Sequence, residues 1–143
     1  MPTEITSRGR SARPWLWTVV MLASAQASPG EATLGQALFT GARPLAAHVA
    51  GQDFALPQDA VACTNCHQGQ PPNVFGPPLT RATLTRARAR RGGPASVYDD
   101  ARFCRALRDG IDPALVVIPQ TMPRYAFSDP QCRALWAFLL TRS

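Results

Sequence analysis

Lysine is absent from the 143-residue sequence, and all fifteen of its basic residues are arginine. This choice reflects base composition more than ligand chemistry, so the formal net charge of +6 indicates no class of partner. The sequence also lacks a repeat with a period of about 20 to 50 residues, which excludes a solenoid. With 45% hydrophobic residues over this length, it has the composition of a single globular domain with a modest core.

A permanent membrane helix needs about 20 apolar residues, and no hydrophobic run in the sequence is that long. The run at 15–23 follows three arginines and precedes small residues at 25–27. This order is typical of a secretory signal peptide. We therefore expect residues 1–27 to be removed on export to the periplasm, leaving 28–143 as one domain. Membrane association is expected only if the signal segment stays uncleaved.

Helix signals occur in three segments of the predicted domain. The first begins with Ser28 as N-cap and ends at Gly41. The second covers 96–108, and the third begins with Asp129 as N-cap. Apolar residues three or four positions apart give each segment one buried face. The stretch 42–62 lacks a sustained period, and we expect it to form loops, with or without a short helix.

The clearest motif in the sequence is Cys63-Thr64-Asn65-Cys66-His67. In a helical turn, residues three apart lie on one side, so both thiols can add to the two vinyl groups of one haem. His67 then offers an imidazole nitrogen to the iron. This spacing is the attachment pattern of c-type haem.

Two other chemistries use cysteines at this spacing. Zinc commonly takes four ligands that include a second Cys or His pair, whereas the remaining cysteines are single and far apart, and His48 is the only other histidine. A dithiol redox pair normally follows a strand in a βαβ unit, and the residues before Cys63 predict no such sheet. Haem attachment is therefore the favoured interpretation.

Methionine is scarce, and two of the three methionines lie in the predicted signal peptide. Met122 is therefore the only thioether expected in the exported chain, and we predict that it is the second axial ligand of the haem iron. Prolines at 119 and 123 stiffen the loop that carries it. A core methionine that fills a gap is the alternative role for Met122, and His48 is the alternative ligand.

The order of these motifs resembles that of a class I c-type cytochrome domain over nearly all of residues 31–143. The shared features are an early helix with Gly35 and Phe39, the attachment motif Cys63-Cys66-His67, the loop Gly76-Pro77-Pro78-Leu79, a helix ending at Gly110, Met122-Pro123 and an aromatic-rich final helix. The resemblance implies an all-α fold, the class I cytochrome c fold, with its N- and C-terminal helices packed around one covalently bound haem c. That packing would place Gly35 and Phe39 against aromatic residues of the last helix.

The resemblance also implies two further contacts. The backbone carbonyl of Pro77 would orient the ring of His67. The helices that carry Cys104 and Cys132 pack together in the resembled fold, so we expect a disulfide between them in an oxidising compartment. Two buried free cysteines are the alternative, because a bridge requires Cα atoms within about 7 Å.

The ligand chemistry indicates electron transfer rather than catalysis. Histidine and thioether together favour ferrous iron and raise the reduction potential, and six-coordinate iron has no open position for a substrate. We expect a periplasmic single-electron carrier, not an enzyme, with a dehydrogenase as donor and a terminal oxidase or another cytochrome as acceptor. The alternatives are a dedicated cytochrome c subunit of a periplasmic dehydrogenase complex and a haem protein that binds gases or other ligands.

An arginine-rich run at 81–91 gives a second, weaker indication of partners. It could dock an acidic protein surface, since complementary charge accelerates encounter, or it could be a solvated surface loop. Nucleic acid is not expected as a partner of an exported protein.

Overall fold

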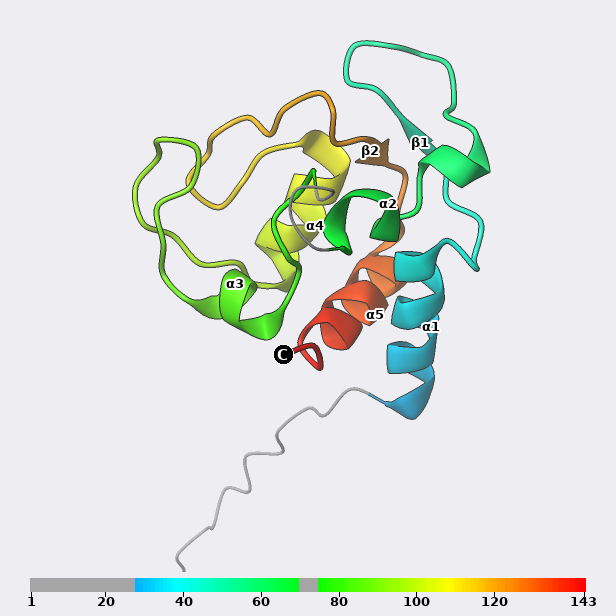
Figure 1. Cartoon of the computed structure of the whole chain (residues 1–143), viewed down its shortest axis with the longest axis horizontal. Helices are drawn as coiled ribbons and strands as arrows, with labels where there is room; N and C mark the ends of the chain where they lie inside the picture. The colour runs from blue at the N-terminus through cyan, green and yellow to red at the C-terminus, as the bar shows by residue number, and fades with distance from the viewer. Residues whose placement is uncertain (1–27, 70–74) are drawn as a thin grey trace, which may run out of the picture.

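The computed structural model describes residues 28–69 and 75–143, and the predicted signal segment 1–27 lies outside them. In chain order, the elements are α1 (Pro29–Thr40), β1 (Ala47–His48), the 3-10 turn η1 (Gln58–Ala60), α2 (Thr64–His67), α3 (Arg81–Thr85), α4 (Asp100–Asp109), β2 (Arg124–Tyr125) and α5 (Asp129–Leu139) (Figure 1). None of the helices in the described ranges is long and apolar enough to cross a membrane.

Helix α1 begins and ends where its sequence predicts. Ser28 is the N-cap, and it forms a capping box in which its hydroxyl accepts from the Glu31 backbone while the Glu31 carboxylate accepts from the Ser28 backbone. Gly41 ends the helix at φ 77°, in the left-handed region where glycine has no Cβ penalty. The prediction for this segment is confirmed.

Helix α4 begins later than predicted. Its N-cap is Asp99, whose carboxylate accepts from the Arg102 backbone N–H at 2.7 Å. Ser96, the expected start, instead forms an antiparallel bridge with Arg88. The spacing of apolar residues extends back to residue 96 and so predicted an earlier start. The helix begins later because Asp99 caps it and because Ser96 pairs with the backbone of Arg88.

Helix α5, in contrast, begins one residue earlier than predicted. Ser128, rather than Asp129, is the N-cap, and its hydroxyl forms a capping box with Gln131. Pro130 stands in the first turn, where the missing N–H costs nothing.

Helices α1 and α5 lie against each other (Figure 1). Gly35 allows this close approach, because a Cβ at this position would lie 2.6 Å from Cβ of Phe138 and would overlap the carbonyl of Ala134. The ring of Phe39 packs 5.7 Å from that of Phe138, centroid to centroid. The contact expected between Gly35, Phe39 and the last helix is therefore present.

A two-stranded antiparallel sheet contradicts the all-α prediction. Strand β1 pairs with β2, with Ala47 opposite Tyr125 and His48 opposite Arg124. The predicted fold class, an all-α class I cytochrome c fold, is therefore wrong, because the described residues combine helices, a small sheet and long loops. Each strand has two residues, too few for the alternation of polarity by which a sequence predicts a strand.

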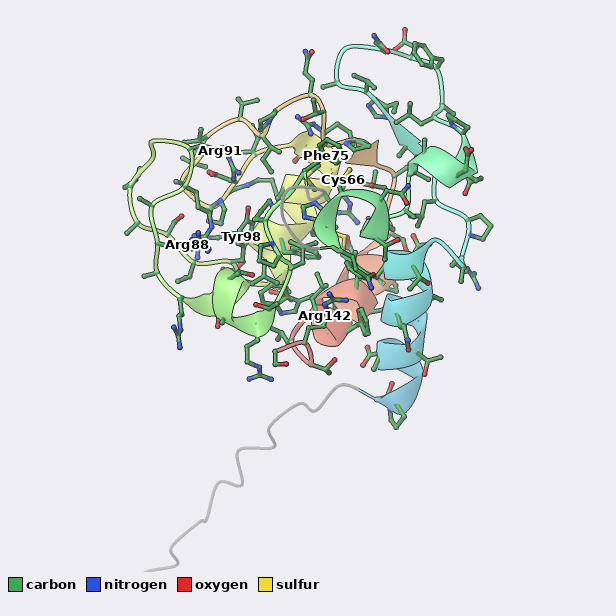
Figure 2. The ribbon with its side chains drawn as sticks, viewed as in Figure 1. Cys66, Phe75, Arg88, Arg91, Tyr98 and Arg142 are labelled. Atoms are coloured by element: carbon green, nitrogen blue, oxygen red, sulfur yellow. A yellow bond between two sulfur atoms is a disulfide. The ribbon has the colours of Figure 1, made fainter. Side chains whose placement is uncertain are left out.

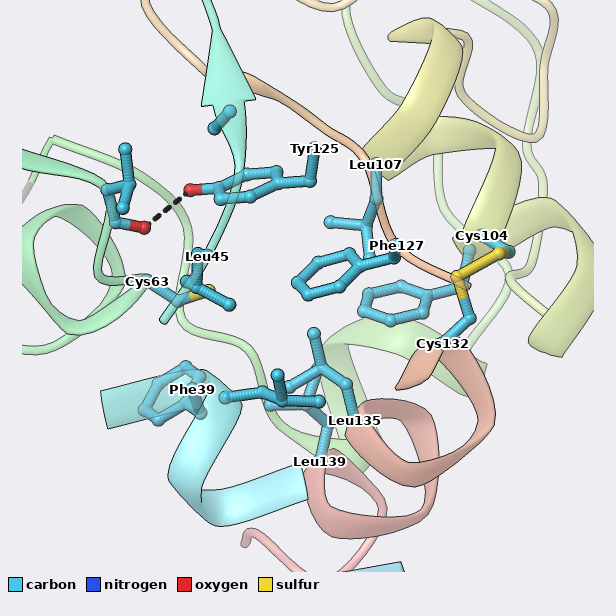
Figure 3. Close-up of a cluster of buried hydrophobic side chains, with 14 of the residues drawn as sticks. Phe39, Leu45, Cys63, Cys104, Leu107, Tyr125, Phe127, Cys132, Leu135 and Leu139 are labelled. Atoms are coloured by element: carbon cyan, nitrogen blue, oxygen red, sulfur yellow. Dashed lines mark hydrogen bonds between the residues drawn. A yellow bond between two sulfur atoms is a disulfide. The ribbon is translucent and has the colours of Figure 1, made fainter. Parts of the chain in front are cut away.

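The core lies among α1, α4, α5 and the segment that enters α5 (Figure 3). Its buried members in that view include Phe39, Leu45, Leu107, Tyr125, Phe127, Leu135 and Leu139. Cys104 of α4 and Cys132 of α5 form a disulfide with their Cα atoms 5.5 Å apart. The expected bridge is confirmed, and it fastens two core helices to each other.

Candidate functional site

The attachment motif forms one short helical turn. The backbone N–H of His67 donates to the carbonyl of Cys63 at 2.9 Å, and that of Cys66 donates to the same carbonyl at 3.3 Å. Cys63 is buried and Cys66 is partly exposed, and both are free thiols. The turn therefore brings two unpaired thiols and one imidazole together, as the spacing predicts.

A cavity of about 580 Å³ opens beside this turn. The volume lies in the range of roughly 300–1,000 Å³ typical of small-molecule and cofactor sites. Residues on its walls include Cys63, Cys66, His67, Gly76, Pro77, Leu79, Leu84, Tyr98, Phe103, Leu107, Ile118, Met122, Tyr125 and Leu135. Most of these side chains are apolar, so the cavity suits a large hydrophobic ligand.

The ring of His67 is held in a fixed orientation. Its Nδ1 lies 2.8 Å from the carbonyl oxygen of Pro77, and since a carbonyl only accepts, Nδ1 carries the proton. The lone pair of Nε2 is then available to a metal. Gly76 makes the approach possible, because a Cβ there would lie 2.6 Å from Nδ1. The contact expected between Pro77 and His67 is confirmed.

Burial favours the neutral forms of both His67 and Cys63. It lowers the pKa of His67, and the hydrogen bond to Pro77 opposes this only in part. A neutral imidazole is the form that binds iron. Burial raises the pKa of the Cys63 thiol to about 11, whereas the reactive cysteine of a dithiol oxidoreductase has a lowered pKa. The environment of the motif therefore differs from that of a dithiol redox site.

Met122 lies on the wall of the same cavity, although it is far from the attachment motif in the sequence. Met122 is the last residue of a loop that begins at Ile118. Its backbone N–H donates to the carbonyl of Pro119 at 3.1 Å and so closes a turn in this loop. His48, the alternative ligand, is exposed on β1 and does not line the cavity. The structure thus places Met122, and not His48, with the attachment motif.

One side of the cavity is polar, and the sequence did not indicate that its residues face a cavity. Arg88, Arg91 and Tyr98 line it, and they lie together on the side of the molecule that carries α3 (Figure 2). Arg91 also forms an ion pair of 2.8 Å with the buried carboxylate of Asp112. Part of the arginine run therefore faces the cavity, a role that neither interpretation of the run included. No pattern in the sequence distinguishes these arginines from arginines on a solvated loop.

Tyr125 is a second cavity residue that the sequence did not indicate. Its hydroxyl donates to the carbonyl of Val61 at 2.9 Å, while its ring packs 5.2 Å from that of Phe127 (Figure 3). This hydrogen bond ties β2 to the residues that precede Cys63. No local pattern could reveal a contact that joins such distant segments.

Within residues 28–69 and 75–143, no group of three or more His, Cys, Asp or Glu side chains is arranged to hold a metal ion. A haem iron needs no such group, because the porphyrin supplies four nitrogens and the protein only the axial ligands. No protein-family model, no curated protein and no solved structure matches the chain. Function is therefore inferred from the chemistry of the cavity.

Proposed function

We propose that this protein carries single electrons on one covalently attached haem c, with Cys63 and Cys66 as attachment sites and His67 and Met122 as axial ligands. One observation carries the proposal: all four residues line the same apolar cavity, with the His67 ring already oriented by Pro77. The partners would be a periplasmic dehydrogenase as donor and an oxidase or another cytochrome as acceptor.

The two thiols are suited to attachment. Each thiol would add across one vinyl group of the haem, so that a carbon–sulfur bond would form and the thiol proton would move to the adjacent carbon. The addition needs no external oxidant or reductant. It does need both cysteines reduced, and Cys63 and Cys66 are free thiols beside a cavity, whereas Cys104 and Cys132 are paired elsewhere. The disulfide is also consistent with an oxidising, exported location.

The axial residues suit electron transfer rather than catalysis. When bound, haem supplies an iron that changes by one electron between its ferrous and ferric states. His67 offers Nε2 while Pro77 holds Nδ1, and Met122 offers a soft thioether that favours the ferrous state. If His67 and Met122 both bound the iron, no position would stay open on it for a substrate.

The remaining walls fit the rest of the cofactor. Leu84, Phe103 and Leu107 would supply an apolar surface for the macrocycle, and Arg88 would supply positive charge for a propionate, whereas the charge of Arg91 is already paired with Asp112. Phe75 lines the cavity although it is 88% exposed, so the cavity reaches the protein surface there. An electron carrier requires such a route for close approach to its partners.

Haem staining of a denaturing gel tests the attachment. The exported wild-type protein should retain haem after denaturation, and Cys63→Ala combined with Cys66→Ala should abolish the stain. Cys104→Ala combined with Cys132→Ala is the matched control, because it also removes two cysteines but leaves the cavity walls intact. Unchanged covalent haem in the Cys63 and Cys66 double variant would falsify the proposed function.

A further inference from the structure

Arg124 is a buried cation placed two residues after Met122. Its side chain is 4% exposed, and it begins strand β2, where its backbone lies opposite His48. The guanidinium packs directly on Gly110, the left-handed residue that ends α4 at φ 68°. A Cβ at Gly110 would overlap the guanidinium, so this glycine makes room for it.

The two donor groups of Arg124 bracket the loop that carries the thioether. Nη1 donates to the carbonyl of Met122 at 2.6 Å, and Nη2 donates to the carbonyl of Ile118 at 2.7 Å. Ile118 in turn donates its N–H to the carbonyl of Gly110 at 2.7 Å. Because the guanidinium is a rigid planar fork, these two bonds fix the separation and direction of the two carbonyls.

The charge of Arg124 is not paired with a carboxylate within the described residues. The ion pairs there join Arg91 to Asp112, Arg102 to Asp99 and Arg108 to Asp129. Arginine stays protonated in proteins, so Arg124 keeps its charge in this buried position. A buried cation whose donors meet only backbone carbonyls costs free energy unless those bonds are kept. Its acceptors belong to the segment that lines the cavity.

We propose that Arg124 is a positioning residue for Met122: its fork holds the 118–122 loop in the shape that presents the thioether to the cavity. This inference rests on the proposed function. Because its guanidinium donates to the backbone carbonyl of Met122, the same residue also holds a fixed positive charge close to the ligand-bearing residue, and this charge would disfavour ferric iron. Arg124 would therefore favour both the retention of the methionine ligand and a higher reduction potential.

Three variants separate this role from a purely structural one. Arg124→Met removes both donors and the charge, and Arg124→Lys keeps the charge but cannot span two carbonyls. Arg108→Met is the control, because Arg108 also donates to a backbone carbonyl, that of Phe127 at 2.7 Å, on a different segment, and its charge is paired with Asp129. Each purified haem protein is titrated with imidazole as a competing ligand, and the weak methionine–iron charge-transfer band and the reduction potential are recorded.

Arg124→Met should bind imidazole more tightly by about tenfold or more, since hydrogen bonds from a charged donor are lost. Its band should weaken and its potential should fall. Arg124→Lys should show the same increase in imidazole affinity with a smaller fall in potential, while Arg108→Met should match the wild type in all three.

Wild-type imidazole affinity in Arg124→Met overturns the inference. If that variant does not accumulate as holoprotein, wild-type affinity in Arg124→Lys overturns it equally. A wild-type protein that holds covalent haem but lacks the methionine band overturns the proposed ligand set itself, which is a distinct result.

Discussion

The disulfide between Cys104 and Cys132 makes a quantitative prediction about stability. The two residues are separated by 28 positions, and each is nearly inaccessible to solvent. In the chain-entropy model, a bridge that closes a loop of this length lowers the conformational entropy of the unfolded state. At 25 °C this raises the free energy of the unfolded state by about 3.5 kcal/mol. Replacing both cysteines with alanine should therefore lower the free energy of unfolding by about that amount. Alanine is preferred to serine here because it buries no unpaired hydroxyl.

The loss of unfolding free energy corresponds to a fall in Tm that depends on the length of the chain. At about 4 °C per kcal/mol for a domain of this length, Tm should fall by about 14 °C. Either single variant already breaks the bridge, so Cys104→Ala, Cys132→Ala and the double variant should lose nearly the same stability. The coupling energy of the double-mutant cycle should thus be close to the bridge energy, about 3.5 kcal/mol in size.

Urea unfolding followed by far-ultraviolet circular dichroism measures this cycle on the exported holoprotein. The visible spectrum should be identical in all four proteins, because neither cysteine lines the cavity. Small and additive losses from the two single variants would refute the reasoning, since unbridged cysteines act independently. Recovery of both as free thiols under non-reducing mass mapping would do the same.

Two further predictions concern the axial ligands. Met122→Ala should abolish the charge-transfer band, lower the reduction potential and allow stoichiometric binding of carbon monoxide that the wild type lacks. A variant unchanged in spectrum and potential would rule out Met122 as the ligand. Gly76→Ala should reduce holoprotein yield and displace the His67 ring, because the new Cβ would lie 2.6 Å from Nδ1. Gly30→Ala, where a Cβ meets nothing within 4 Å, should leave both unchanged.

Features encoded in a few consecutive residues could be predicted from the sequence. The capping box at Ser28, the left-handed end of α1 at Gly41 and the turn that gathers Cys63, Cys66 and His67 are all set by neighbours within four positions. Interactions at this range follow directly from helix geometry. The prediction of both helix ends and of the thiol and imidazole cluster needed no tertiary information.

Features that depend on backbone pairing outside the helices could not be predicted. The pairing of Ala47 with Tyr125 creates a sheet from strands too short to show a period, and the bridge from Ser96 to Arg88 shortens α4 at its start. Arg91 illustrates the same limit for side chains, since its partner is the buried carboxylate of Asp112. An arginine run looks equally charged in sequence whether it faces water or a cavity.

The position of each candidate axial ligand depends on a glycine, because a side chain at that glycine would overlap a residue packed against it. Gly76 lets the His67 ring approach the backbone closely enough to donate to Pro77, and Gly110 lets the Arg124 fork reach the loop that ends at Met122. In each case the ligand-bearing segment is held by hydrogen bonds to backbone carbonyls rather than by an ion pair. Carbonyl acceptors do not titrate, so this arrangement can keep an imidazole and a thioether in place over a wide pH range. In the proposed haem protein, such a site would change its iron ligands only when the backbone itself moves, and this would suit an electron carrier that works with little rearrangement.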